Sequence, residues 1–91
     1  MITEKTKIIK NSDIEVTDFE NEKVMMNLEI GRYFTLNEVG SRIWELIDKN
    51  NEVEGIINGL LEEYDVSREM CREQVFKYID DLIQYGIVKA L

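Results

Sequence analysis

The sequence predicts one small α+β domain, in which an N-terminal three-stranded antiparallel sheet precedes three helices in a winged-helix-like layout. The chain has 91 residues, which is enough for one domain and no second core. Apolar and polar residues alternate in the first third, as in strands, and apolar residues then recur every three or four positions, as in helices. No stretch has the composition of a linker or a repeat, so we treat residues 1–91 as a single unit.

Alternation of apolar and polar residues indicates the strands. Residues 7–10 are a short candidate, and residues 14–19 alternate and are rich in β-forming side chains. Residues 20–22 then supply a polar turn into a strand at residues 23–30. The apolar side chains of that strand share one face: Val24, Met26, Leu28 and Ile30.

The sheet is expected to end at residues 32–36, after a turn at Gly31. Because the connections are too short for parallel crossovers, the simplest arrangement is an antiparallel meander, with one face covered by the helices. If residues 32–36 are its last strand, their outer N–H and C=O groups lack partners. Such an edge can accept an extended peptide as an additional strand.

Helical spacing begins at Asn37. Residues 35–38 fit a capping box, Asn37 is an alternative N-cap, and Asn50 or Asn51 is a natural stop. The first helix then carries an apolar stripe at Val39, Ile43, Trp44 and Ile47.

Two further helices are predicted after this stop. The second has the cleanest stripe, and we interpret its Gly55 and Gly59 as points of close packing against a neighbour. The third begins at the cap Ser67 and ends before Gly86, after which Ile87 and Val88 fold back on it. The stripe of the second helix is formed by Val53, Ile56, Ile57, Leu60, Leu61 and Tyr64. In the third helix, Val75, Ile79, Leu82 and Ile83 can face the core, while one flank carries Cys71, Gln74 and Tyr78.

The charge balance argues against nucleic-acid and anionic-membrane partners. There are 11 Lys and Arg residues against 19 Asp and Glu, a net charge of −8, whereas proteins that bind phosphates cluster their cations. A winged-helix DNA-binding protein stays an alternative because the order of helices permits it. However, the second helix has no Lys or Arg, and the third offers only Arg68, Arg72 and Lys77 among acidic residues.

The missing residue types restrict the possible chemistry. Without His there is no Ser–His or Cys–His pair and no His-bound metal. The single cysteine, Cys71, allows no intrachain disulfide and no four-thiolate site. No serine has the Asp-Ser-Leu setting of an acyl carrier protein, and acidic pairs such as Glu62–Glu63 are interpreted as solvated helix surface. Catalysis would have to rest on carboxylates, Lys or Tyr, which few small domains achieve alone, so the expectation is a protein that is not an enzyme, with no catalytic residue, no metal and no cofactor.

The sequence also bears on location. No stretch approaches the roughly 20 apolar residues of a membrane span. Residues 1–5 lack the apolar core of a signal peptide. We expect a cytoplasmic protein in which Cys71 stays reduced.

The strand-to-helix junction resembles a family motif. Leu36-Asn37, Gly40 and Ile43-Trp44 are similar to the Leu-Asn-x-x-Gly-x-x-Ile-Trp stretch of the PqqD family, the peptide chaperones named from pyrroloquinoline quinone biosynthesis. Later apolar positions match in order and spacing, so the resemblance covers the chain from about Ile8 to Val88.

The resemblance implies a RiPP recognition element, a domain that binds the leader of a ribosomally made precursor peptide and presents its core to modifying enzymes. In this family the leader adds as a strand to the third strand of the sheet and lies against the third helix. For Val75, a place in the core is an equal alternative to a binding role. The resemblance implies Tyr33, Phe34, Thr35 and Leu36 as the strand residues that bind the peptide. From the open edge we add Arg32 in the strand and Cys71, Gln74, Val75 and Tyr78 on the facing helix.

The predicted function is therefore non-catalytic capture of a leader peptide by β-strand addition. A partner enzyme would do the chemistry, such as a radical maturase or a lasso-peptide leader protease, and the chain itself would be a monomer or weak dimer. A protein–protein adaptor or homodimerisation module that pairs the same edge with its own copy is the main alternative. A winged helix that retains DNA contact is a weaker one.

Overall fold

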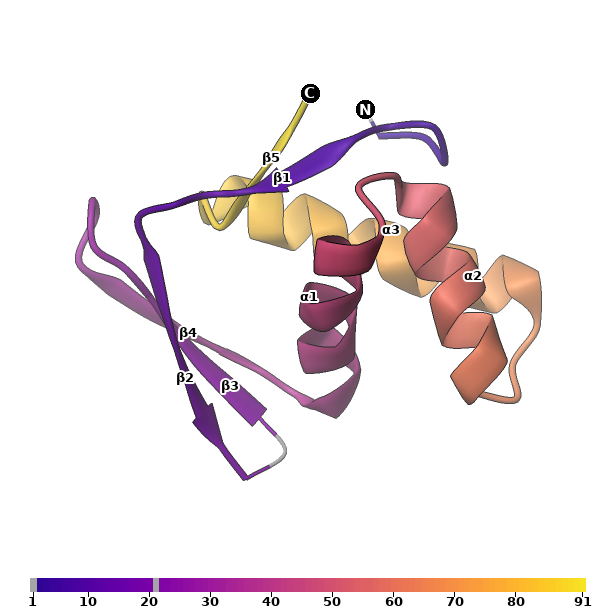
Figure 1. The fold of residues 1–91 in the computed structure, drawn as a ribbon, viewed down its shortest axis with the longest axis horizontal. Coiled ribbons are helices and arrows are strands. Elements are labelled where there is room, and N and C mark those ends of the chain that lie inside the picture. The colour runs from indigo at the N-terminus through magenta and orange to yellow at the C-terminus, as the bar shows by residue number, and fades with distance from the viewer. Residues whose placement is uncertain (1, 21) are drawn as a thin grey trace.

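The computed structural model describes residues 2–20 and 22–91, which form an α+β domain (Figure 1). The predicted turn at residues 20–22 includes Asn21, which, like Met1, lies outside the described residues. In chain order the elements are β1 (Ile8–Lys10), β2 (Ile14–Phe19), β3 (Glu22–Asn27), β4 (Arg32–Leu36), α1 (Glu38–Lys49), α2 (Val53–Glu63), α3 (Arg68–Gln84) and β5 (Val88–Ala90).

The strands form two sheets where the sequence predicted one. The expected antiparallel meander is present, with β3 between β2 and β4. A second, two-stranded antiparallel sheet joins β1 to β5, with Ile8 opposite Ala90 and Lys10 opposite Val88. Figure 1 shows this pair crossing above the helices, where it brings the two ends of the chain together. Such a pairing has no local signal, because its strands lie at opposite ends of the sequence.

The buried face of β3 is not the face that carries its apolar stripe. Met25 is fully buried, together with Lys23 and Asn27, whereas Val24 and Met26 lie on the other face and are only half-buried. The strand also ends at Asn27 rather than at residue 30, so two members of the predicted stripe fall in the following turn and are exposed, Leu28 and Ile30.

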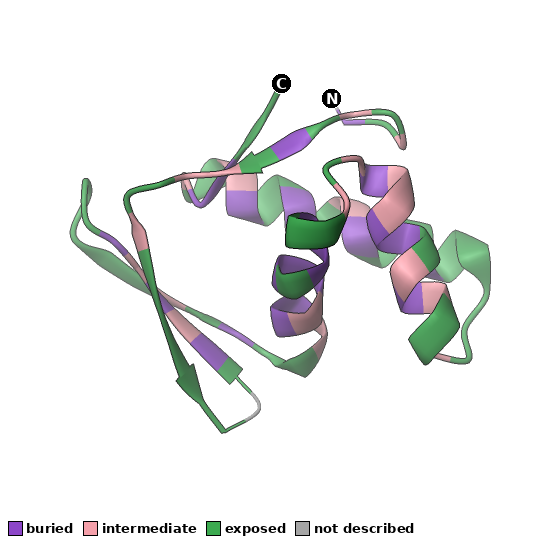
Figure 2. Cartoon of the chain, viewed as in Figure 1, coloured by how far each residue is buried: buried purple, intermediate pink, exposed green. Residues whose placement is uncertain are grey.

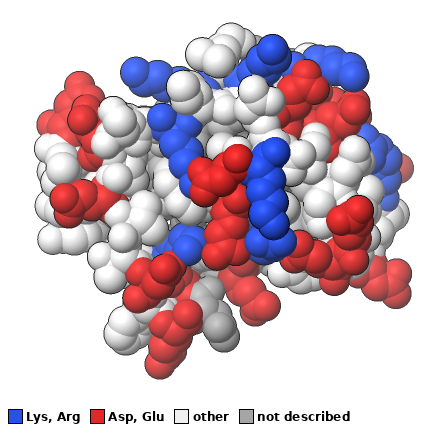
Figure 3. All heavy atoms as spheres, in the orientation of Figure 1, with Lys and Arg blue, Asp and Glu red and all other residues white. Residues whose placement is uncertain are grey.

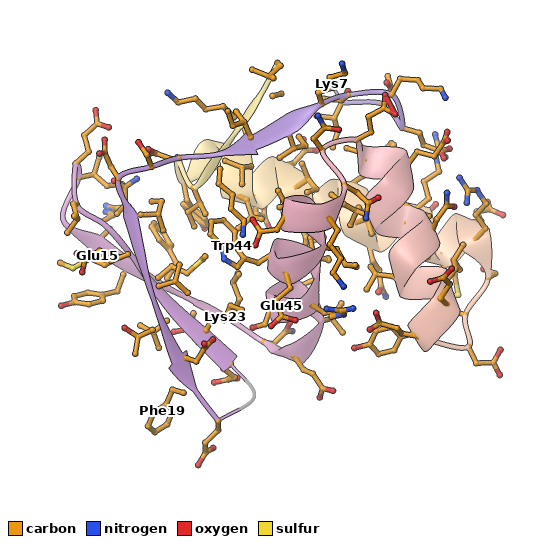
Figure 4. All side chains as sticks on the ribbon, in the orientation of Figure 1. Lys7, Glu15, Phe19, Lys23, Trp44 and Glu45 are labelled. Atoms are coloured by element: carbon orange, nitrogen blue, oxygen red, sulfur yellow. The ribbon has the colours of Figure 1, made fainter. Side chains whose placement is uncertain are left out.

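Specific partners allow the two polar side chains to be buried on this face. The Lys23 ammonium lies 2.5 Å from Asp18 Oδ1 and 3.4 Å from Glu45 Oε2, and in Figure 4 it points toward α1. The hydrogen bond that Lys23 donates to Asp18 is the main reason that the pKa of Lys23 is raised, against the opposing effect of burial. Asn27 Nδ2 donates to the carbonyl of Tyr85 at 3.1 Å. Burial without such partners would be costly.

The helix ends follow the capping signals of the sequence. Asn37 is the N-cap of α1, and its Oδ1 accepts a hydrogen bond from the Gly40 N–H at 2.8 Å. The N-cap is therefore Asn37, the alternative to a box formed by residues 35–38. Asn50 is the C-cap of α1, Ser67 caps α3, and Gly86 ends α3 with φ of +74°.

The core lies where the helices meet each other and the inner face of the sheet (Figure 2). Gly55 and Gly59 allow α2 to pack closely on α1, as predicted. A Cβ atom at Gly55 would lie 2.6 Å from Asn50 Cβ, and one at Gly59 would lie 2.9 Å from Leu46 Cδ2. In the described part of the chain, no helix combines the length and the apolar character needed to cross a membrane. The fully buried side chains include Ile8, Met25, Ile43, Ile56, Ile57, Val75 and Ile79.

Candidate peptide-binding site

The outer edge of β4 has no partner strand among residues 2–20 and 22–91. The Leu28 N–H donates a hydrogen bond to the Asp13 carbonyl on the β2 side. Because hydrogen-bonding direction alternates along a strand, the N–H and C=O groups of even-numbered β3 residues point toward β2 and those of odd-numbered residues toward β4. Phe34 lies opposite Met25 and therefore bonds to β3. By the same alternation, Tyr33 and Thr35 direct their N–H and C=O groups outward.

Two contacts place β4 alongside α3. The Phe34 ring stacks on Tyr85, with centroids 4.4 Å apart, and the Tyr78 hydroxyl donates to Asn37 Oδ1 at 2.7 Å. Residues 34–37 therefore run beside α3 in the opposite direction. Gly40 makes this approach possible, because a Cβ atom there would lie 2.9 Å from Tyr78 Cε1. These contacts give Asn37 and Gly40, two positions of the family motif, a structural role at the junction of β4 and α1.

A groove follows α3 from this junction. Its wider part is a hollow of about 480 Å³ lined by polar and apolar groups, and its narrower part is an apolar hollow of about 180 Å³; the two adjoin at Val39 and Gln74. We call both together the α3 groove. The wider part is lined by Asn37, Val39, Gln74, Lys77, Tyr78 and Asp81, and the narrower by Val39, Ile43, Leu60, Tyr64, Val66, Cys71 and Gln74.

The predicted strand residues differ in how accessible they are. Arg32 and Thr35 are exposed, and Tyr33 is 69% exposed. Phe34 is half-buried under its stacking partner. Leu36 is buried, and its carbonyl accepts a hydrogen bond from Ser41 Oγ at 3.0 Å. Arg32, Tyr33 and Thr35 are therefore accessible and Phe34 partly so, while Leu36 contributes to the core.

The predicted helix residues differ in the same way, since two are accessible in the groove and two are buried. Gln74 is exposed and Tyr78 half-buried, and both line the α3 groove. Cys71 is buried at the apolar end of the groove, where burial raises the pKa of its thiol despite the charge of Arg68. Val75 is fully buried, which agrees with the core alternative.

Sequence reasoning missed several groove residues, and helical spacing could have found some of them. Lys77 and Asp81 stand three and seven positions after Gln74, so they share a face of α3 with Gln74 and Tyr78. Asn37 and Val39 belong to the start of α1, and only the packing of α1 on α3 brings them to the groove.

A third hollow, of about 290 Å³, lies between the sheet and the helices and is lined mainly by charged side chains. Its cations are already paired. The Arg42 guanidinium contacts Glu63 and Glu45, and the hydrogen bonds from Arg42 hold the pKa of Glu63 below its usual value. In the part of the chain that the structure describes, no three side chains of His, Cys, Asp or Glu gather so as to hold a metal ion.

Comparison with solved structures gives two similar folds. "TbiB1 in Complex with the TbiA(beta) Leader Peptide" has a TM-score of 0.82 and 26% identity, covering 88% of this chain and 93% of that one. "Lasso peptide synthetase B1 complexed with the leader peptide" has a TM-score of 0.81 and 18% identity, covering 91% of this chain and 98% of that one.

Comparison with protein families and with curated proteins completes the assignment. None of the curated proteins matches this chain. The family model described as "Coenzyme PQQ synthesis protein D (PqqD)" matches residues 22–88. This match contains β3, β4 and the three helices, and therefore both the open edge and the α3 groove. The chain belongs to the PqqD family.

Proposed function

We propose that this protein binds the leader segment of a ribosomally made precursor peptide without catalysing a reaction, and that the leader adds as a strand to β4. The observation that carries the proposal is the open edge of β4 beside the α3 groove. It is supported by membership of the PqqD family and by the similarity to TbiB1, which was solved with a leader peptide.

The geometry supports this mode of binding in two ways. The outward N–H and C=O groups of Tyr33 and Thr35 can hydrogen-bond to a guest main chain, which supplies affinity that does not depend on sequence. Alternate side chains of a strand point to opposite faces, so every second guest side chain would turn toward Phe34 and the α3 groove. Gln74 and Tyr78 then become selectivity residues.

A binder of this kind hands its guest to another protein. In this proposal a cytoplasmic modifying enzyme, such as a radical maturase or a lasso-peptide leader protease, acts on the presented precursor. The charge supports a peptide guest over DNA, because α2 contains no Lys or Arg and the chain carries a net charge of −8.

The proposal is tested by adding a negative charge beside the open edge, at Tyr33, and in the α3 groove, at Tyr78. Tyr33→Glu and Tyr78→Glu should each weaken the binding of a fluorescein-labelled leader, measured by anisotropy, while the circular dichroism spectrum stays that of the folded protein. Phe19→Glu is the matched control, since Phe19 is 64% exposed, much as Tyr33 is, but lies on β2, away from the β4 edge. Unchanged affinity in both tyrosine variants would refute the site.

The alternative is that β4 pairs with β4 of a second copy. Light scattering after size exclusion, with and without leader, separates the two functions. A monomer that gains only the mass of the peptide supports leader binding. A stable dimer that persists when leader is added would favour the dimerisation module.

A further inference from the structure

The outer face of the β2–β3–β4 sheet is apolar at its centre, and none of the described helices covers it. Residues directly opposite each other share a face of the sheet. On this face Met26 lies beside Tyr33, and Val24, the next residue of β3 on the same face, lies beside Thr35. Phe19 and Tyr33 are 64% and 69% exposed. In Figure 4, Phe19 projects from β2 away from the helices. We call this surface the outer face.

The charges around the outer face are mostly negative, with Arg32 as an exposed cation at the β3–β4 end of the sheet. Glu15 and Glu22 lie on it, opposite Met26 and Phe19. The turns at its ends add further carboxylates, and Figure 3 shows acidic side chains over this part of the molecule as over the rest of the visible face. Within residues 2–20 and 22–91, no cation pairs with any of the carboxylates at Asp13, Glu15, Glu20, Glu22 and Glu29.

The inner face shows a different arrangement. Lys23, from the same strand as Val24, is turned inward and neutralises Asp18 and Glu45. The outer face therefore combines an apolar centre with an acidic rim whose carboxylates form no ion pair within residues 2–20 and 22–91, although Glu20 and Glu22 also border the hollow that contains Lys23 and Arg42. Apolar surface of this kind, bordered by polar residues, is typical of a protein–protein interface.

We propose that the outer face docks the partner enzyme, through an apolar patch that is bordered by Lys and Arg on the enzyme. Charge complementarity selects this occupant, because cations would neutralise the rim as the apolar centres meet. A second copy of the chain would bring the same carboxylates against each other in a symmetric contact, which opposes self-association.

The inference rests on the proposed function and extends it to the enzyme that receives the leader. Tyr33 belongs to the outer face through its side chain and to the open edge through its backbone. An enzyme on the outer face would therefore sit beside a guest strand on β4. The sheet would carry both partners, with separate surfaces for each.

The test uses a purified leader protease or radical maturase that acts on the precursor bound by this protein, titrated in biolayer interferometry against the immobilised protein of 91 residues. Phe19→Ser should weaken binding of the enzyme about tenfold or more, as expected for an exposed aromatic anchor. The double reversal Glu15→Lys with Glu22→Lys should also weaken it and flatten its dependence on salt. Met70→Ser, which changes an apolar side chain that is 57% exposed on α3, should have no effect.

Each variant is also titrated with labelled leader, and Phe19→Ser should keep the wild-type affinity. The proposed docking surface is overturned if the enzyme binds Phe19→Ser and the charge-reversed variant as tightly as wild type. It is also overturned if the enzyme does not bind the wild-type protein at all. A wild-type dimer in sedimentation equilibrium that Phe19→Ser dissociates would overturn it too. Failure of wild type to bind leader would instead be a failure of the proposed function.

Discussion

Replacing Thr35 with proline tests the open edge of β4 at a single backbone atom. Thr35 lies opposite Val24 in the pair whose backbone groups do not bond to each other, so its N–H points away from β3. Proline removes that N–H and is tolerated on edge strands. The hydrogen bonds between β3 and β4 should therefore persist while the outer edge loses a donor.

The expected magnitude follows from the lost bond. A main-chain hydrogen bond contributes about 0.5–1.5 kcal/mol net, and a guest carbonyl left buried without a donor costs about 1–3 kcal/mol. Thr35→Pro should therefore weaken leader binding by about 1–3 kcal/mol, which corresponds to a dissociation constant roughly five to 150 times larger.

Isothermal titration of leader into wild type and variant measures this difference, and a thermal melt checks the fold. Val16→Pro is the matched control, because Val16 lies opposite Met25 and directs its N–H to the other open edge, that of β2. The control should bind leader as wild type does. The reasoning is refuted if folded Thr35→Pro keeps full affinity, or if both proline variants lose it equally.

Three further predictions concern the framework. Arg42→Met should lower the free energy of unfolding at pH 7 by less than about 1 kcal/mol, because the pair with Glu63 is partly exposed. Since the folded-state pKa of Glu63 is lowered, urea titrations should show this difference shrink as the pH falls from about 4.5 through that pKa. Burial raises the pKa of Cys71, so dithionitrobenzoate at pH 8 should react far more slowly with folded than with urea-unfolded protein; equal rates would contradict the burial. Gly55→Ala should lower the free energy of unfolding, measured by urea titration, by about 1–2 kcal/mol, because crowding against Asn50 outweighs the gain in helix propensity; increased stability would contradict it.

The helices could be predicted from the sequence because their signals are local. Asn37 and Ser67 each hydrogen-bond to an N–H three residues on, and Gly86 adopts the positive φ that ends α3. These interactions lie within one helical turn, so a sequence window contains all their partners. The close approach at Gly55 was also foreseen, because a glycine in a strong apolar stripe requires a packing reason.

The candidate site was predictable only in part. The edge position of β4 follows from the short turns of a meander, and the structure has it. Tyr78 and Gln74 line the groove, as their flank of α3 suggested, whereas Val75, one position after Gln74, points into the core. The contribution of Asn37 to the groove needed the helix-on-helix packing that joins it to Tyr78.

By itself, the sequence determined the order and ends of the helices, the meander and its open edge, because these depend on periodicity, caps and turns within short windows. Only the tertiary structure decided which face of β3 is buried, since an apolar stripe on one face competes with Lys23 and Asn27, whose partners come from α1 and Tyr85. It also decided that β1 pairs with β5. Contacts between residues far apart in the sequence determine both the buried face of β3 and the pairing of β1 with β5. A short sequence window contains only one of the two residues in each such contact.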